Sequence, residues 1–152
     1  FLTDTNDGGP EILRDMAEML SAMDRSERIQ ALIDMGEKFK PVPAEVAVKP
    51  YPESHRVPHC ESEAFVFWTP QEDGSLKYYF DVLNPQGISA KATAVILDKA
   101  LSGAPVDEVT QVNPDVIYDI FGRELSMGKN MGLTGMVNMC KMAAVLAKRQ
   151  QG

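Results

Sequence analysis

The chain has 152 residues, 44% of them hydrophobic and 24% charged, a composition typical of one globular domain and unlike that of a disordered segment. The net charge of -7 and the pI of about 4.8 argue against nucleic-acid binding, because an acidic surface repels phosphate backbones. No apolar run approaches the roughly 20 residues that cross a bilayer, so no transmembrane segment is expected.

The N-terminal part predicts a leader followed by two helices. Residues 1–9 are rich in aspartate and glycine and predict a flexible leader, and Pro10 fits the first position of a helix. Apolar residues at helical spacing continue this helix to Met23. Ser26 is the expected N-cap of the second helix. The apolar face of that helix should hold Ile29, Leu32, Ile33 and Phe39.

The middle of the chain predicts an irregular segment followed by a β-hairpin. Five prolines between Pro41 and Pro58 exclude a regular element there. Residues 64–69 and 76–83 then predict two strands, joined by a long loop over residues 70–75. In the second strand, one face should be buried and the opposite face should be polar. The buried set is Tyr78, Phe80 and Val82, and the opposite set is Lys77, Tyr79 and Asp81.

Helices are expected after the hairpin, over residues 88–101, from Pro105, from Asn113 or Pro114 to Phe121, and from about Lys129 to Lys148. The last helix carries an apolar stripe of Leu133, Met136, Val137, Cys140, Ala144 and Ala147. These elements predict a single α+β domain, a small antiparallel sheet packed by helices in the order α-α-β-β-α-α-α.

Cys60 is the candidate functional residue, because it ends a proline-broken loop just before a buried aromatic strand. A reactive cysteine must be reachable and partly in the thiolate form, which Arg56 and a protonated His55 or His59 would favour by charge. The alternative is a small apolar side chain that fills the edge of the sheet. Two cysteines are too few for a disulfide framework, so a reducing setting with at least one free thiol is expected.

Two further motifs have simpler interpretations. His55, His59 and Cys60 have spacings seen in zinc sites, but a structural site needs four ligands, so solvated loop histidines are preferred and no metal or cofactor is expected. The Gly128–Gly132 run lacks the pattern of a phosphate-binding loop and favours helix capping, although Lys129 there would attract an anion. Five methionines between residues 127 and 142 mark either core or a partner surface, and core is preferred.

Four segments together resemble the SufE/CsdE sulfur-acceptor family, the Fe-S metabolism associated domain. They are Ser26–Gly36 with the proline-rich linker after it, Arg56–Ser62, the Phe65–Trp68 strand and Gly132–Leu133. They occur in the order and spacing of that family, over roughly residues 25–148. A SufE-like domain is therefore expected over residues 25–150, preceded by a leader and N-terminal helix over residues 1–24.

The resemblance implies a sulfur-transfer accessory protein rather than a stand-alone enzyme. Family members accept sulfur from a pyridoxal-phosphate cysteine desulfurase. Cys60 would attack the terminal sulfur of the partner's persulfide, become a persulfide, and pass that sulfur to an iron–sulfur cluster scaffold. The family fold is α+β and places the cysteine at the tip of a loop beside the sheet.

Several residues beside Cys60 depart from the family pattern, although Ser62 is retained. His59 replaces a glycine before the cysteine and is expected to change the shape or mobility of the loop. Glu61 replaces a glutamine and would disfavour the thiolate. Lys129 and Met131 occupy positions where the family often has arginine and asparagine, and lysine does not reproduce an arginine fork.

These departures leave alternatives to sulfur transfer. The fold would then serve as a non-catalytic structural or regulatory subunit of a large multisubunit complex, or as an interaction module beside another activity. The chain begins at Phe1 rather than Met, which fits removal of a targeting peptide. The expected location is the plastid stroma or another organelle matrix, and otherwise the cytoplasm.

Overall fold

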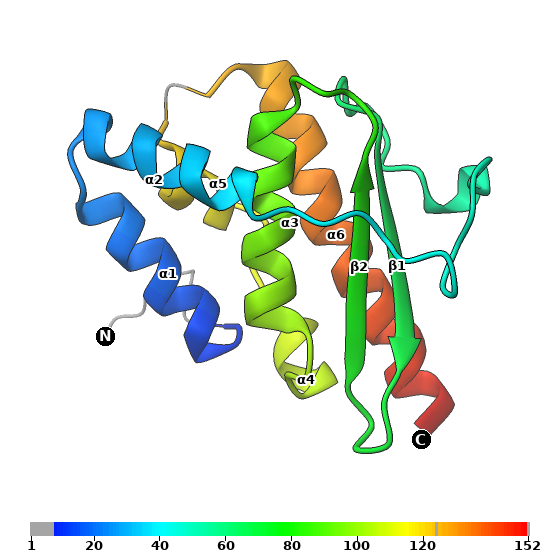
Figure 1. Ribbon diagram of the computed structural model, residues 1–152. Helices are drawn as coiled ribbons and strands as arrows, with labels where there is room; N and C mark the ends of the chain where they lie inside the picture. The colour runs from blue at the N-terminus through cyan, green and yellow to red at the C-terminus, as the bar shows by residue number, and fades with distance from the viewer. Residues whose placement is uncertain (1–7, 124, 152) are drawn as a thin grey trace.

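The computed structural model describes residues 8–123 and 125–151, in which helices pack around a two-stranded sheet (Figure 1). The elements in chain order are α1 (Glu11–Ala22), α2 (Arg25–Glu37), the 3₁₀ helix η1 (Glu53–His55), β1 (Ala64–Pro70), β2 (Leu76–Val82), α3 (Ile88–Leu101), α4 (Val106–Val109), α5 (Val116–Phe121) and α6 (Met127–Gln151). This confirms the expected α+β class, and four helices follow the hairpin where the sequence predicted them, one more than the order α-α-β-β-α-α-α counts. None of the described helices has the length and apolar character needed to cross a membrane.

The sheet is an antiparallel hairpin whose two faces are covered by different parts of the chain. Ala64 lies opposite Val82 at one end, and Pro70 lies opposite Leu76 at the other. Helices α3 and α6 pack on one face, while the proline-rich segment crosses the other face as an irregular strap (Figure 1). The strap is residues 40–52, and it is followed by η1, a short helix that the proline count had excluded.

The main core lies between the sheet and the helices. The expected stripe on α6 is confirmed for Leu133, Met136, Val137, Cys140 and Ala144, which are buried, while Ala147 is only partly buried. Helix α1 belongs to the same core, to which it contributes Leu13, Ala17 and Leu20. Its packing against α3 and α5 joins the N-terminal helix to the rest of the domain.

The alternation along β2 is only half confirmed. Tyr78, Phe80 and Val82 enter the main core as expected, but Asp81 on the opposite face is also buried, with 5% of its surface exposed. The strap explains this burial, because the Tyr51 hydroxyl donates a 2.6 Å hydrogen bond to Asp81 Oδ2. Burial and this hydrogen bond raise the pKa of Tyr51 to about 12. A buried carboxylate needs such partners.

The start of α2 also differs from expectation. Asp24, rather than Ser26, is the N-cap: its Oδ1 accepts a 2.9 Å hydrogen bond from the Glu27 backbone N–H. Glu27 Oε1 accepts from the Asp24 backbone N–H at 3.2 Å, which completes a capping box. Ile29 is 47% exposed instead of lying on the buried face, which consists of Leu32 and Gly36.

This cap predicts unequal effects of two neighbouring substitutions. Asp24→Ala should lower the free energy of unfolding by about 1 kcal/mol, because it removes the acceptor for the first-turn N–H. Ser26→Ala should change it by less than about 0.5 kcal/mol, as is usual for an exposed residue without a cap role. Urea denaturation of both variants measures the difference. Equal losses would show that the cap has been assigned to the wrong residue.

Candidate functional site

Cys60 lies at the tip of a short closed loop between the strap and β1. The base of the loop is held by the Val57 backbone N–H, which donates a 2.8 Å hydrogen bond to the Ala64 carbonyl. A second hydrogen bond of 3.1 Å, from the Glu63 N–H to the Cys60 carbonyl, tightens the tip. Cys60 is a free, partly exposed thiol, whereas Cys140 is free and fully buried.

The loop rests directly on the backbone of α6 because three glycines line the contact. We call Gly128, Gly132 and Gly135 the glycine seam. A Cβ atom at Gly132 would lie 3.1 Å from Cys60 Cα and 3.2 Å from its Sγ. A Cβ atom at Gly135 would lie only 2.9 Å from a methyl group of Val57. Side chains at Gly132 and Gly135 would therefore press on the cysteine loop.

The turn before α3 forms the other wall of the site and is tied to the same loop. The Asn84 N–H donates a 3.2 Å hydrogen bond to the Ser62 carbonyl. A Cβ atom at Gly87 would lie 2.9 Å from both Cβ and Oγ of Ser62. Ser62 therefore joins the cysteine loop to the start of α3, a contact that again requires glycine.

A cavity of about 60 Å³ lies beside the thiol, between the first turns of α3 and α6. It is lined by Cys60, Glu61, Ser62, Gln86, Gly87, Ile88, Ser89, Ala90, Gly128, Lys129, Gly132 and Leu133. This volume exceeds what one water-sized group needs. The first turns of helices carry backbone N–H groups without intrahelical partners and favour negative charge, to which Lys129 adds a full positive charge. These groups favour a small anionic group in the cavity, and the carboxylate of Glu61 on the same lining opposes it.

His59 takes a left-handed backbone conformation, with φ of 59°. Non-glycine residues rarely adopt this region, although histidine does so more readily than most. His59 was expected to change the shape or mobility of the loop. Its backbone instead adopts the left-handed conformation that a glycine would adopt at low cost. The side chain itself is exposed to solvent. The closing hydrogen bonds and the seam fix the loop strongly enough to hold this strain.

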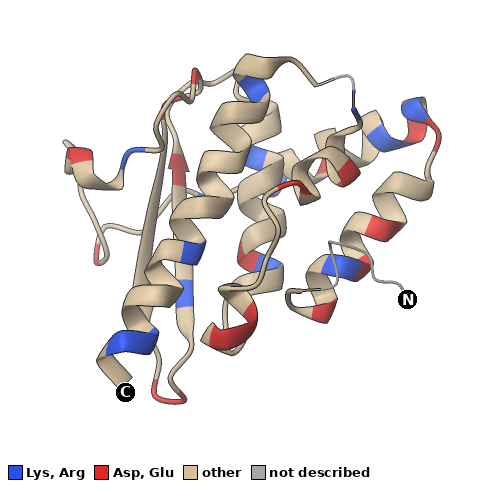
Figure 2. Ribbon diagram, turned by 180° about the vertical axis from the view of Figure 1, so that it is seen from behind, with Lys and Arg blue, Asp and Glu red and all other residues tan. Residues whose placement is uncertain are grey.

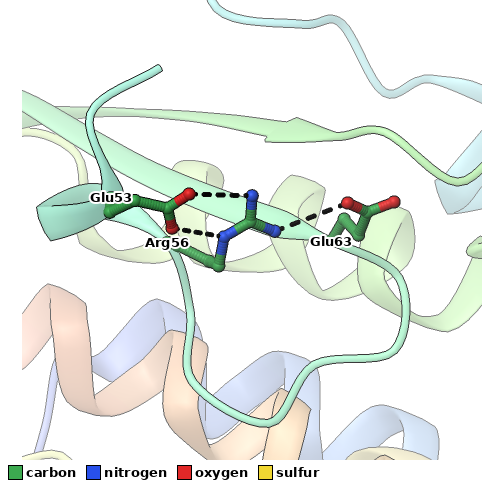
Figure 3. A network of polar contacts seen from close by, with 3 residues as sticks. All are labelled: Glu53, Arg56 and Glu63. Atoms are coloured by element: carbon green, nitrogen blue, oxygen red, sulfur yellow. Dashed lines mark hydrogen bonds and ion pairs between the residues drawn. The ribbon is translucent and has the colours of Figure 1, made fainter. Parts of the chain in front are cut away.

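Arg56 is engaged by carboxylates rather than directed at the cavity. Its Nε lies 2.7 Å from Glu53 Oε2, and its Nη1 lies 3.5 Å from Glu63 Oε1 (Figure 3). The guanidinium also lies over the ring of Phe65, at 4.7 Å. The Arg56 hydrogen bond and charge lower the pKa of Glu53. Two carboxylates therefore offset the charge that was expected to favour the Cys60 thiolate.

His55 is likewise occupied elsewhere. Its Nδ1 lies 2.7 Å from the Val66 carbonyl, and its ring stacks on Phe67 with centroids 4.6 Å apart. It therefore helps to cover the sheet instead of joining His59 and Cys60. Within the described ranges, no group of three or more His, Cys, Asp or Glu side chains is placed to hold a metal ion.

The structure thus brings Cys60, Glu61, Ser62 and Lys129 together around one cavity, with His59 at the exposed side of the loop. Sequence reasoning missed the seam, although it noted the glycines at the start of α6. The available signal was their spacing, since positions 128, 132 and 135 fall on one helical face. Helix capping accounts only for the first turn, where Ser126 Oγ accepts a 3.3 Å hydrogen bond from the Lys129 N–H.

Fold and site together define a small α+β domain that presents one loop cysteine. The sequence matches the family model of SufE, described as an Fe-S metabolism associated domain, over residues 14–144. The chain therefore belongs to the SufE family, and the match extends into α1. No curated protein matches the sequence significantly.

A solved structure supports the fold. The chain is similar to the solution structure of a hypothetical protein from Thermus thermophilus, with a TM-score of 0.71. The two chains are 24% identical, and the alignment covers 93% of this chain and 98% of the other. Nearly the whole domain therefore follows a fold already seen in solution.

The seam predicts opposite results for two glycine substitutions on one helix. Gly128→Ala should raise the free energy of unfolding by up to about 1 kcal/mol, because alanine favours helix and meets only the flexible end of Glu61. Gly132→Ala should not show this increase, because the added methyl group crowds the Cys60 backbone, which costs about 1–3 kcal/mol. The displaced loop should also react several-fold faster with a thiol reagent.

Chemical denaturation and thiol-reagent labelling of Cys60 measure these two effects. Similar stability gains in both variants, with unchanged labelling, would show that the loop does not rest on Gly132.

The strain at His59 gives a separate prediction. His59→Gly should raise the free energy of unfolding by up to about 1 kcal/mol, since relief of the left-handed conformation outweighs the entropy that glycine loses on folding. Glu61→Gly is the matched control, because Glu61 is not among the residues with positive φ and should only lose stability. Thermal denaturation decides the sign. A loss of stability in both variants would argue against the left-handed conformation.

Proposed function

We propose that this protein accepts sulfur from a cysteine desulfurase on Cys60 and carries it as a persulfide for iron–sulfur cluster assembly. Membership of the SufE family supports the link to iron–sulfur metabolism. The observation that carries the proposal is the position of Cys60, partly exposed at a loop tip beside an anion-favouring cavity. Cys140 does not compete for this role, because it is fully buried and burial raises the pKa of its thiol.

The transfer step is a thiol–persulfide exchange. The Cys60 thiolate attacks the terminal sulfur of the donor's persulfide, a new S–S bond forms on Cys60, and the donor's own S–S bond breaks. The donor cysteine leaves as a thiolate, and the proton on the transferred sulfur stays with it or passes to water. The exchange needs no external oxidant or reductant, because one S–S bond replaces another.

The cavity suits the product of this step. A persulfide is longer than a thiol by one sulfur atom, and the space of about 60 Å³ beside Cys60 accommodates such a group. The first turns of α3 and α6 would stabilise its negative charge, and Lys129 would add to that effect. Glu61 lines the same cavity, and its negative charge offsets that of Lys129. The proposed site therefore retains the anion through backbone groups more than through side-chain charge.

The proposal predicts a modification at one defined residue. After incubation with a cysteine desulfurase and cysteine, the peptide that contains Cys60 should gain the mass of one sulfur atom, and reducing agent should remove it. Cys60→Ser should abolish the gain. Cys140→Ala, the control, should leave it unchanged because the native Cys140 thiol is inaccessible. Peptide mass spectrometry without reductant makes the measurement.

A persulfide that forms on Cys140 alone, or on neither cysteine, would contradict the proposal. The fold would then be retained for a structural or regulatory role in a larger assembly.

A further inference from the structure

Exposed apolar side chains gather around the cysteine loop. Of nine large apolar residues that are exposed within the described ranges, two line the spaces at the site and two are next in sequence to residues that line the Cys60 cavity. They are Ile29, Ile88, Met127 and Met131, which are 47%, 45%, 78% and 43% exposed. Met127 and Met131 each precede a seam glycine on α6. An apolar patch of this kind marks a surface that meets a partner.

A groove leads away from the cavity toward α2. It measures about 240 Å³ and is lined by Arg25, Arg28, Ile29, Leu32, Ile33, Ile88, Ser89, Phe121 and Leu125. We call it the α2 groove. Ile88 and Ser89 line both this groove and the Cys60 cavity, so the two spaces are neighbours that share a wall at the start of α3. A partner that delivers a group to Cys60 would therefore lie next to the α2 groove.

The charge of the groove is opposite to that of the whole chain. Its described lining contains two arginines and no carboxylate, although the net charge of the protein is -7. The Arg28 guanidinium lies beside Gly122, where its nearest atom would be 3.3 Å from an added Cβ atom. Lys and Arg positions occur at the starts of both α2 and α6, at the same end of the molecule (Figure 2). The groove lining itself, with its two arginines, is complementary to acidic groups.

We propose that the α2 groove docks an acidic, apolar segment of the sulfur-donor protein while its persulfide meets Cys60. This inference rests on the proposed function and adds where the donor is held. Apolar side chains of the segment would pack on Ile29 and Ile88, and a carboxylate would pair with Arg28. A protein segment fits better than a small molecule, because exposed apolar residues occur both at the groove, at Ile29 and Ile88, and on α6, at Met127 and Met131.

The test compares delivery of sulfur by a protein and by a small molecule. Cys60 persulfide formation is measured against increasing concentrations of the desulfurase, and separately with inorganic polysulfide, which needs no docking. Ile29→Asp should raise the desulfurase concentration for half-maximal rate by about tenfold, the scale of a lost interface anchor. Arg28→Gln should raise it by a smaller factor and reduce its dependence on salt. Polysulfide should load all variants equally.

Ile12→Asp is the matched control, since Ile12 is an isoleucine on helix α1 with 55% exposure and does not line the groove. It should behave as the wild type does with both donors. Two results would overturn the docking inference and leave the proposed function standing. One is an unchanged desulfurase concentration for half-maximal rate in Ile29→Asp, and the other is a loss of loading by polysulfide in the same variant. Failure of the wild-type Cys60 to take sulfur from either donor would overturn the proposed function itself.

Discussion

The contact between the Cys60 loop and the backbone of α6 is the constraint on which the site depends. Gly132 and Gly135, on one face of the helix, let the loop lie where side chains would otherwise stand, so that the thiol reaches the first turns of two helices. The same closeness explains why Gly87 is needed opposite Ser62. The position of Cys60 thus depends on the lack of side chains at these glycines. The strained His59 backbone is tolerated because the loop has little room to relax.

This arrangement separates the two thiols into different roles. Cys140 lies on the buried stripe of α6 and behaves as a core residue, while Cys60 lies against the glycine seam of the same helix but remains in contact with solvent. The charges that sequence reasoning placed around Cys60 are mostly used elsewhere: Arg56 binds Glu53 and Glu63 on the strap side. What remains at the cavity is the charge of Lys129, which the charge of Glu61 opposes, and the partial charge of the helix ends.

The parts of the structure that depend on local patterns could be predicted, and those that depend on contacts between distant segments could not. Periodicity gave the hairpin and the buried stripe of α6, and the position of Cys60 between proline and strand identified the loop. The burial of Asp81 was missed because it depends on Tyr51, which lies 30 residues away. The seam was missed for the same reason, since the spacing of its glycines has meaning only once the loop is known to lie on them.

The most direct test of this account is native-state thiol labelling of Cys60 and Cys140 at increasing denaturant. If the loop rests on the seam without belonging to the core, Cys60 should react through a local opening. The free energy of that opening should lie well below that of global unfolding and depend little on denaturant. Cys140 should react only when the whole domain unfolds. If Cys60 instead reacts only together with Cys140, at the same free energy and with the same denaturant dependence, the loop is part of the core and the account is contradicted.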